Sequence, residues 1–296
     1  PRMSAAWPAG WNAERLEEFL AEIGRQVLAG GWSPEDARGC VRLDLEVCPA
    51  EGVDAMVRAG ACRVGARVPD PLRLGDLASY LDHTLLRPDA TVAEIDRICD
   101  EALRHRFASV CVNGSWVARC AEILAGSDVL VCSVVGFPLG AMATEVKAYE
   151  ARRALEDGAR EIDMVLHVGA LKGGDHDYVR RDIETLATLC HRMGGRLKVI
   201  LETALLTDEE KLAACRLAQA AGADFVKTST GFSKGGATPQ DIALMRRVVG
   251  PVMGVKASGG VRDAVGAQEM IEAGATRIGA SASVEILRGE SGSGEY

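Results

Sequence analysis

Lysine is scarce in this chain of 296 residues: only seven of its 34 Lys and Arg residues are lysines, and none precedes Lys147. A coding bias that writes surface cations as arginine explains the scarcity itself. Under such a bias, a lysine inside an apolar strand is harder to attribute to random surface charge. Lysines in strand segments are therefore candidates for a functional role.

Other absences exclude whole classes of protein. No apolar run approaches the roughly 18 residues of a membrane span, so we expect no membrane partner. A net charge of −8 argues against nucleic acid as the main partner. The nine cysteines are odd in number and form no C-x-x-C pair, which favours reduced thiols. The chain also begins with no signal-peptide pattern. We therefore expect a cytoplasmic protein. The five histidines show neither H-x-H nor H-E-x-x-H spacing, so we expect no metal site.

The chain divides into regions with different sequence patterns. Residues 12–66 show helical periodicity, and the prolines at 69 and 71 predict a boundary because the residue before a proline favours extended backbone. We therefore expect a helical N-terminal extension over 1–73, with a role in packing or in assembly of a homo-oligomer. A second region over 74–290 carries the chemistry, and residues 291–296 are expected to form a flexible tail.

The second region alternates short apolar runs with amphipathic stretches. Eight such runs predict strands, at 80–85, 108–112, 129–136, 161–166, 197–202, 224–230, 252–259 and 277–280. Glycines at 158, 222 and 274 stand where each intervening helix should end before the next strand. Eight strand–helix units in this length predict an α/β fold, a (β/α)8 barrel, and a doubly wound sheet is the alternative.

Strand alternation places three charged residues inside the expected barrel. Asp163, Lys227 and Lys256 each lie on the mixed face of their strand, opposite an apolar face suited to helices. Lys198 also has the inward phase, but Glu202 shares its face and is expected to neutralise it. A buried ion pair of Asp163 with one lysine is the structural alternative; it leaves the other ammonium unpaired, which costs several kcal/mol.

Two inward lysines on consecutive strands have a specific chemical use. A neighbouring ammonium and desolvation both favour the free amine of a lysine, which can then attack a carbonyl to form a Schiff base. The iminium accepts electrons when an adjacent C–C bond breaks, and Asp163 can relay protons. This is the machinery of a metal-independent aldolase. The alternation does not decide which lysine is the nucleophile.

Glycine-rich segments follow the last three predicted strands. Gly231, then Gly259 and Gly260, and then Gly279 and Ser281 offer backbone N–H groups on the rim where barrels commonly hold a phosphate. The alternative is that each glycine serves only a tight turn. Lys234 either adds charge to this site or is a solvated loop residue.

Six sequence stretches together resemble the deoxyribose-phosphate aldolase family, over roughly residues 74–287. They are DHTLL at 82–86, VCVN at 110–113, GFPLG at 136–140, EIDMV at 161–165, FVKTSTGF at 225–232 and GVKASGGVR at 254–262.

The resemblance implies the role of each residue. Lys227 would form the Schiff base, Lys256 would tune it, and Asp163 would be the proton-transfer partner. The reaction would be reversible cleavage of 2-deoxy-D-ribose 5-phosphate into D-glyceraldehyde 3-phosphate and acetaldehyde, without a cofactor. The glycines named above and Ser281 would hold the phosphate, and Tyr296 matches the C-terminal tyrosine that some members use as a proton shuttle.

The chain departs from the family pattern at several places. Ala282 replaces a frequent second serine, Gly114 follows Asn113 in place of a frequent proline, and the N-terminal extension is absent from shorter members. Two rival functions remain at this point: another Schiff-base barrel enzyme resembling transaldolase, and a catalytically silent barrel that binds a sugar phosphate.

Overall fold

The structure, a computed structural model, describes residues 77–292 of the chain. The helical extension expected over 1–73 lies outside the described residues. So does most of the expected tail, including Tyr296. The described residues contain all eight predicted strands.

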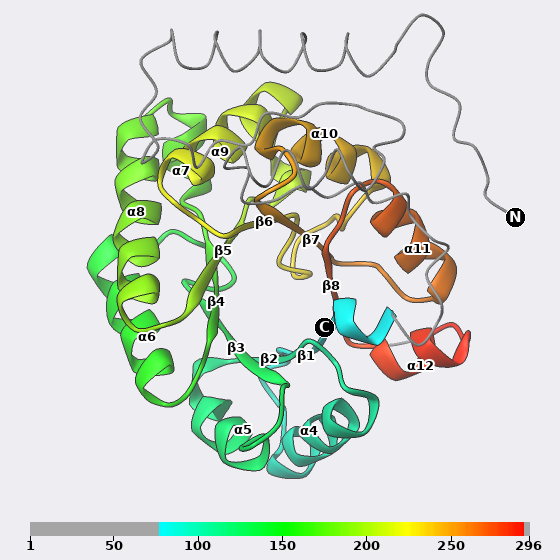
Figure 1. Cartoon of the computed structure of the whole chain (residues 1–296). Coiled ribbons are helices and arrows are strands. Elements are labelled where there is room, and N and C mark those ends of the chain that lie inside the picture. Colours follow the sequence, from blue (N-terminus) through cyan, green and yellow to red (C-terminus); the bar gives the residue numbers. More distant parts are fainter. Residues whose placement is uncertain (1–76, 293–296) are drawn as a thin grey trace, which may run out of the picture. The chain divides into compact units, whose positions relative to one another are not determined.

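Eight parallel strands close into a barrel in sequence order, with β8 pairing to β1 (Figure 1). The strands are β1 (Leu81–Leu85), β2 (Ser109–Val112), β3 (Leu130–Val135), β4 (Glu161–Val165), β5 (Arg196–Ile200), β6 (Phe225–Lys227), β7 (Gly254–Ser258) and β8 (Arg277–Ala280). Each overlaps one predicted strand, so the predicted (β/α)8 barrel is confirmed. The doubly wound alternative is wrong because the sheet has no open edge.

Helices form an outer ring around the strands (Figure 1). They are α4 (Val92–His105), α5 (Val117–Ile123), α6 (Thr144–Glu156), α7 (Val168–Lys172), α8 (His176–Arg192), α9 (Asp208–Ala220), α10 (Pro239–Val249), α11 (Ala264–Glu272) and α12 (Ser283–Arg288), with 3-10 turns η1 (Ala78–Tyr80), η2 (Gly114–Trp116) and η3 (Thr203–Leu205). Within residues 77–292, none of these helices combines the length and apolarity that crossing a bilayer requires.

Local sequence explains where helices begin and end. Thr91 caps α4 through a reciprocal hydrogen-bonded box with Glu94, which satisfies backbone donors that the first helical turn leaves unpaired. At the helix-to-strand joints, Gly158, Gly222 and Gly274 adopt φ values of 111°, 80° and 113°. These positive values are accessible to glycine at little steric cost, which confirms the predicted helix stops.

The two faces of the strands bury different chemistry. Outward side chains such as Ile162 and Met164 are fully buried in the apolar layer beneath the helices. The interior of the barrel instead buries Lys198, Lys227 and Lys256, each no more than 1% exposed. The assignment of apolar faces to the helices and mixed faces to the interior is therefore confirmed.

Candidate active site

Asp163, Lys227 and Lys256 meet at the centre of the barrel, as predicted. They come from β4, β6 and β7, and Lys227 and Lys256 are direct register partners on adjacent strands. Asp163 Oδ2 lies 2.9 Å from Lys227 Nζ and 2.7 Å from Lys256 Nζ. The same carboxylate oxygen of Asp163 therefore contacts the Nζ atoms of both lysines.

Lys198 completes this cluster, but its partners differ from the predicted one. Its Nζ lies 2.7 Å from Asp163 Oδ1 and 2.6 Å from Glu161 Oε2. The expectation that Glu202 neutralises Lys198 is wrong. Strand β5 ends at Ile200 and Glu202 has left-handed backbone, so strand alternation no longer governs its direction. The Glu202 carboxyl group binds Thr230 instead.

Further charged groups that strand reasoning did not single out form a second set of contacts. Asp82 Oδ2 lies 2.5 Å from Lys256 Nζ, and Asp82 Oδ1 lies 2.6 Å from the guanidinium of Arg277. Arg277 also contacts Glu161, which binds the partly exposed Arg196. The signal was present: Asp82, Glu161 and Arg277 have the same inward phase as the lysines.

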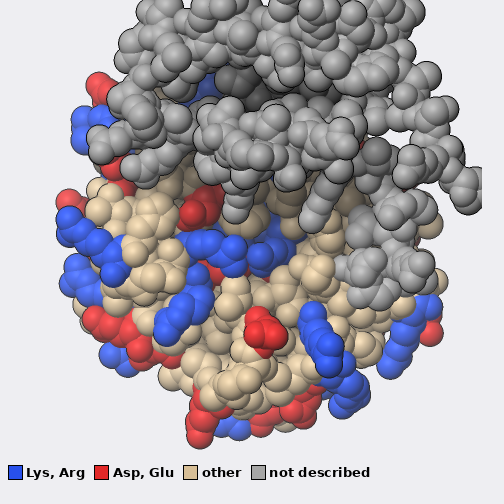
Figure 2. All heavy atoms as spheres, viewed as in Figure 1, with Lys and Arg blue, Asp and Glu red and all other residues tan. Residues whose placement is uncertain are grey.

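The buried charges in this cluster do not balance. Three carboxylates, those of Asp82, Glu161 and Asp163, face four buried cationic side chains, those of Lys198, Lys227, Lys256 and Arg277. Lys227 has the weakest pairing, since its single carboxylate contact is an oxygen that it shares with Lys256. Viewed down the barrel, blue and red side chains are both visible at the middle of the face (Figure 2).

The cluster holds its members in defined charge states. Burial alone would lower the pKa of Lys256, but the carboxylates of Asp163 and Asp82 outweigh it and hold that pKa well above its usual value. Burial alone would raise the pKa of Asp163, but Lys198, Lys227 and Lys256 hold it well below its usual value. Lys256 therefore stays an ammonium and Asp163 a carboxylate near neutral pH.

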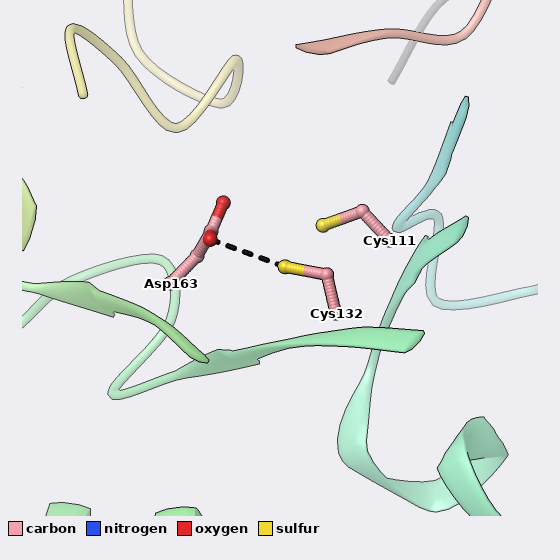
Figure 3. A group of neighbouring side chains, drawn as sticks. All are labelled: Cys111, Cys132 and Asp163. Carbon is pink, nitrogen blue, oxygen red and sulfur yellow. Dashed lines mark hydrogen bonds between the residues drawn. The ribbon is translucent and has the colours of Figure 1, made fainter. Parts of the chain in front are cut away.

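Two cysteines lie beside this carboxylate. Cys111 and Cys132 are register partners on β2 and β3, and Cys132 Sγ donates to Asp163 Oδ1 at 3.1 Å (Figure 3). Their sulfurs and the carboxylate lie within 4.8 Å of one another, close enough to share a metal ion. Burial raises the pKa of Cys132, so it is a thiol and not a thiolate ligand. The lysine contacts of both Asp163 oxygens further disfavour a cation here.

His83 faces away from the interior. Its Nε2 lies 2.8 Å from the carboxylate of Glu101 on α4, and the residue is 3% exposed. His83 is therefore a core histidine that has a hydrogen-bond partner on the helix side of β1.

The loops after β6 and β7 lie close together on the carboxyl-end rim. Gly231, Gly259 and Gly260 have φ values of 87°, 86° and 83°. A Cβ added to Gly236 would lie 2.2 Å from the carbonyl oxygen of Gly259, and the Ala237 N–H donates to that oxygen at 2.9 Å. Close backbone approach, possible only without side chains, brings these loops together.

Gly279 stands apart from these loops. It lies within β8, and a Cβ there would be 3.0 Å from Lys256 Cε and 3.1 Å from Ser258 Cβ. Its missing side chain leaves room for Lys256. Ser281 follows β8 directly, ahead of α12.

A pocket of about 220 Å³ opens on the same rim, near the carboxyl ends of β4 and β6. We call it the rim pocket; it is lined by Pro138, Leu139, Val165, Val168, Glu202, Leu205, Thr230, Phe232 and Ser233. Val165 is two residues beyond Asp163 on β4, and Thr230 is three beyond Lys227. The rim pocket therefore lies near the carboxyl ends of the strands that carry Asp163 and Lys227, and its lining includes neither of these residues.

A closed (β/α)8 barrel with buried lysines around one aspartate defines a class: barrel enzymes equipped for amine chemistry on carbonyl compounds. The model of the DeoC/LacD family aldolases matches residues 77–290. The chain belongs to this family, and it is an aldolase.

Individual proteins similar to this chain are named as aldolases too. Deoxyribose-phosphate aldolase of Geobacillus sp. (strain WCH70) is 57% identical over 221 residues, which cover 75% of this chain and 99% of that protein. The Brevibacillus brevis protein of the same name is 61% identical over 214 residues, covering 72% of this chain and 96% of the relative. The solved tetrameric deoxyribose phosphate aldolase of Aeropyrum pernix is 36% identical, with a TM-score of 0.69 over 73% of this chain and 91% of that one.

Proposed function

We propose that this aldolase reversibly cleaves 2-deoxy-D-ribose 5-phosphate into D-glyceraldehyde 3-phosphate and acetaldehyde through a lysine Schiff base. The observation that carries the proposal is the surplus cation at the barrel centre, where four cationic side chains meet three carboxylates. Burying an unpaired charge costs several kcal/mol, so one lysine is favoured as a free amine. The names of the relatives supply the substrate.

Lys227 is the best candidate for the nucleophile. Lys198 and Lys256 each lie within 2.7 Å of at least two carboxylates, whereas Lys227 has one shared contact at 2.9 Å. The Lys256 ammonium, held charged by its carboxylates, disfavours a second positive charge on its register partner. The geometry therefore supports Lys227 as the amine and Lys256 as the residue that tunes it.

The reaction then follows from these positions. The Lys227 amine adds to the C1 carbonyl of the open-chain sugar phosphate, and loss of water gives an iminium. The C2–C3 bond breaks, its electron pair flows toward the iminium to form an enamine, and the C3 hydroxyl proton leaves as glyceraldehyde 3-phosphate departs. Protonation of the enamine carbon and addition of water release acetaldehyde and the free amine. Asp163 Oδ2 contacts both lysine nitrogens, which suits it to pass protons between them.

The phosphate is assigned to the carboxyl-end rim. Gly231, Gly259 and Gly260 place loop backbone there in positive-φ conformations, and Ser281 opens the loop after β8. The role of Gly279 in this site rests on the sequence, since its contacts point to room for Lys256. Tyr296 is proposed as a proton shuttle, for which a Tyr296→Phe variant with reduced turnover is the test.

The proposal extends to assembly and location. We infer a homo-oligomer in the cytoplasm, supported by the tetramer named for the Aeropyrum pernix relative and by the six buried free cysteines within the described residues. Size-exclusion chromatography with light scattering measures the oligomeric state directly.

Trapping the Schiff base tests the proposed function. Incubation with acetaldehyde and borohydride should leave a stable two-carbon adduct on the Lys227 peptide, and the enzyme should turn over 2-deoxyribose 5-phosphate. A Lys172→Arg variant, which changes a partly exposed lysine on α7, serves as the matched control and should label normally. No adduct, or an adduct on Lys256 alone, would contradict the assignment.

A further inference from the structure

Six buried side chains at the barrel centre form a closed ring of ion pairs. Cations and carboxylates alternate around it, and each side chain contacts the next through a nitrogen and an oxygen that lie 2.5–3.0 Å apart. Each carboxylate is therefore shared by two cations. We call this set the ion-pair ring; in order, its members are Arg277, Asp82, Lys256, Asp163, Lys198 and Glu161, which contacts Arg277 again.

The ion-pair ring is neutral when all six of its groups are charged. Three cations meet three carboxylates, so each positive charge in the ring is matched by a negative one. Lys227 is not a member of the ring; its Nζ contacts the ring through Asp163 Oδ2 at 2.9 Å, an oxygen that also contacts Lys256. Lys227 is therefore the cation for which the ring has no carboxylate left.

Arg277 is the member of the ring whose charge is fixed. A guanidinium group keeps its proton in proteins, whereas a buried lysine can lose one. Burial alone would lower the pKa of Arg277, but the carboxylates of Asp82 and Glu161 outweigh it and raise that pKa above its usual value. Arg277 is also the register partner of Lys256, which in turn is the register partner of Lys227. A permanent positive charge therefore lies in the same row of residues as the two lysines, across β6, β7 and β8.

We propose that Arg277 is a positioning residue for the aldolase reaction: it occupies Asp82 and Glu161 in the ring, so that no carboxylate is left to keep Lys227 protonated. The inference rests on the proposed role of Lys227 as the nucleophile. Without Arg277, three lysines would face three carboxylates, and the charges would balance with Lys227 as an ammonium. An ammonium has no lone pair with which to attack a carbonyl. Arg277, the first residue of β8, therefore acts through the ring and needs no contact with the substrate.

The other titratable groups around Lys227 stay the same in the test. The thiols of the register partners Cys111 and Cys132 come from β2 and β3. The carboxyl group of Glu202 follows β5 and is hydrogen-bonded to a hydroxyl group. Arg196 contacts the ring from outside, but its side chain is 44% exposed and water screens its charge. Helix α9 packs against the outer face of β6, away from the Lys227 amine. Differences among variants of the ring therefore report the ring itself.

The test measures how fast acetaldehyde forms the adduct between pH 6 and pH 10, with borohydride added at intervals to trap it. Arg277→Met should slow adduct formation at pH 7 by about 10- to 100-fold and come within about threefold of the wild type near pH 10, since one neighbouring charge commonly changes the free-amine fraction by that factor. Glu161→Gln removes a carboxylate instead, so its rate at pH 7 should be the same or higher. The double variant restores a surplus of one cation and should return to within about threefold of the wild type at pH 7. A purely structural role predicts the opposite, because the double variant has lost more contacts than Arg277→Met.

Arg277→Lys keeps a positive charge and should keep the wild-type pH profile; together with Glu161→Gln it decides the matter if Arg277→Met does not fold. Arg153→Met, which changes an exposed arginine on α6 that pairs with Asp157, is the matched control and should leave the profile unchanged. The inference is overturned by a loss in Arg277→Met that is equal at pH 7 and pH 10, by a double variant no faster than Arg277→Met, by a displaced profile in Arg277→Lys, or by a slower Glu161→Gln at pH 7. Absence of a Lys227 adduct in the wild type would instead overturn the proposed function, which separates the two failures.

Discussion

Two buried lysine–carboxylate clusters in this barrel have opposite character. Between α6 and α8, Lys147 Nζ lies 2.6 Å from Asp182 Oδ2 and donates to the Val165 carbonyl at 3.1 Å, while Thr144 binds the other carboxylate oxygen at 2.8 Å. One cation meets one anion, and every oxygen is used. At the barrel centre, cationic side chains outnumber carboxylates.

The difference teaches how to distinguish a structural lysine from a reactive one. Both kinds are fully buried, so burial does not separate them. Charge balance does: a balanced pair has no reason to change protonation state, whereas a surplus cation favours release of a proton. Lys147 should therefore matter for stability and Lys227 for chemistry.

Replacing Lys227 should produce the largest effect. Lys227→Met removes the amine that would form the Schiff base, so we expect turnover of 2-deoxyribose 5-phosphate to fall by about 10⁴-fold or more. The free energy of unfolding should change little, because Lys227 is favoured as a free amine and its single carboxylate contact is shared with Lys256. Steady-state kinetics and urea denaturation measure both quantities. A stability loss as large as that of Lys147→Met would break the comparison.

Breaking the balanced pair should act on stability. Lys147→Met leaves Asp182 buried without its cation, and we expect the unfolding free energy to fall by about 3–5 kcal/mol. Adding Asp182→Leu to the same chain should recover much of the loss, since a matched apolar pair leaves no unpaired charge. Turnover per folded molecule should change little. Urea titrations of the single and double variants measure the coupling free energy between Lys147 and Asp182.

Lys256→Leu tests the electrostatic role of the second lysine. Without the neighbouring ammonium, the Lys227 amine holds its proton more readily, so adduct formation near neutral pH should slow by roughly 100-fold. Raising the pH should restore part of the rate. Adduct formation with acetaldehyde, followed from pH 6 to 10, provides the profile, and a defect independent of pH would indicate lost geometry instead.

Acid should weaken the central cluster. The pKa values of Asp163 and Asp82 both lie below their usual range. Burial alone would raise the pKa of Asp82, but the positive charges of Arg277, Lys256 and Lys198 outweigh it. The contribution of the two carboxylates to stability is present above the unfolded pKa near 4 and is lost as the pH falls through the folded values. Between pH 5 and 3 the unfolding free energy should drop by up to about 1.4 kcal/mol per pH unit for each group. Asp163→Asn should give a shallower slope in urea titrations.

Much of the barrel could be predicted because its signals are local. Alternation along single strands placed Asp163, Lys227 and Lys256 on inward faces, and the glycines at the helix ends marked the joints between units. Predicted strands ran past the observed ends where loops begin, as at β6, which stops at Lys227. Alternation carries no information beyond the last ladder hydrogen bond, and for that reason the direction of Glu202 was wrong.

The sequence by itself determined the period-two phase of each strand and hence which lysines enter the barrel. Only the tertiary structure decided their partners. Barrel closure pairs β8 with β1, which brings Arg277 to Asp82 across 195 residues, and the circular interior lets Asp163 reach three lysines from three strands. Pairing between strands depends on distances that a single strand does not encode, so charge balance, and with it the choice of the reactive lysine, is a property of the closed fold.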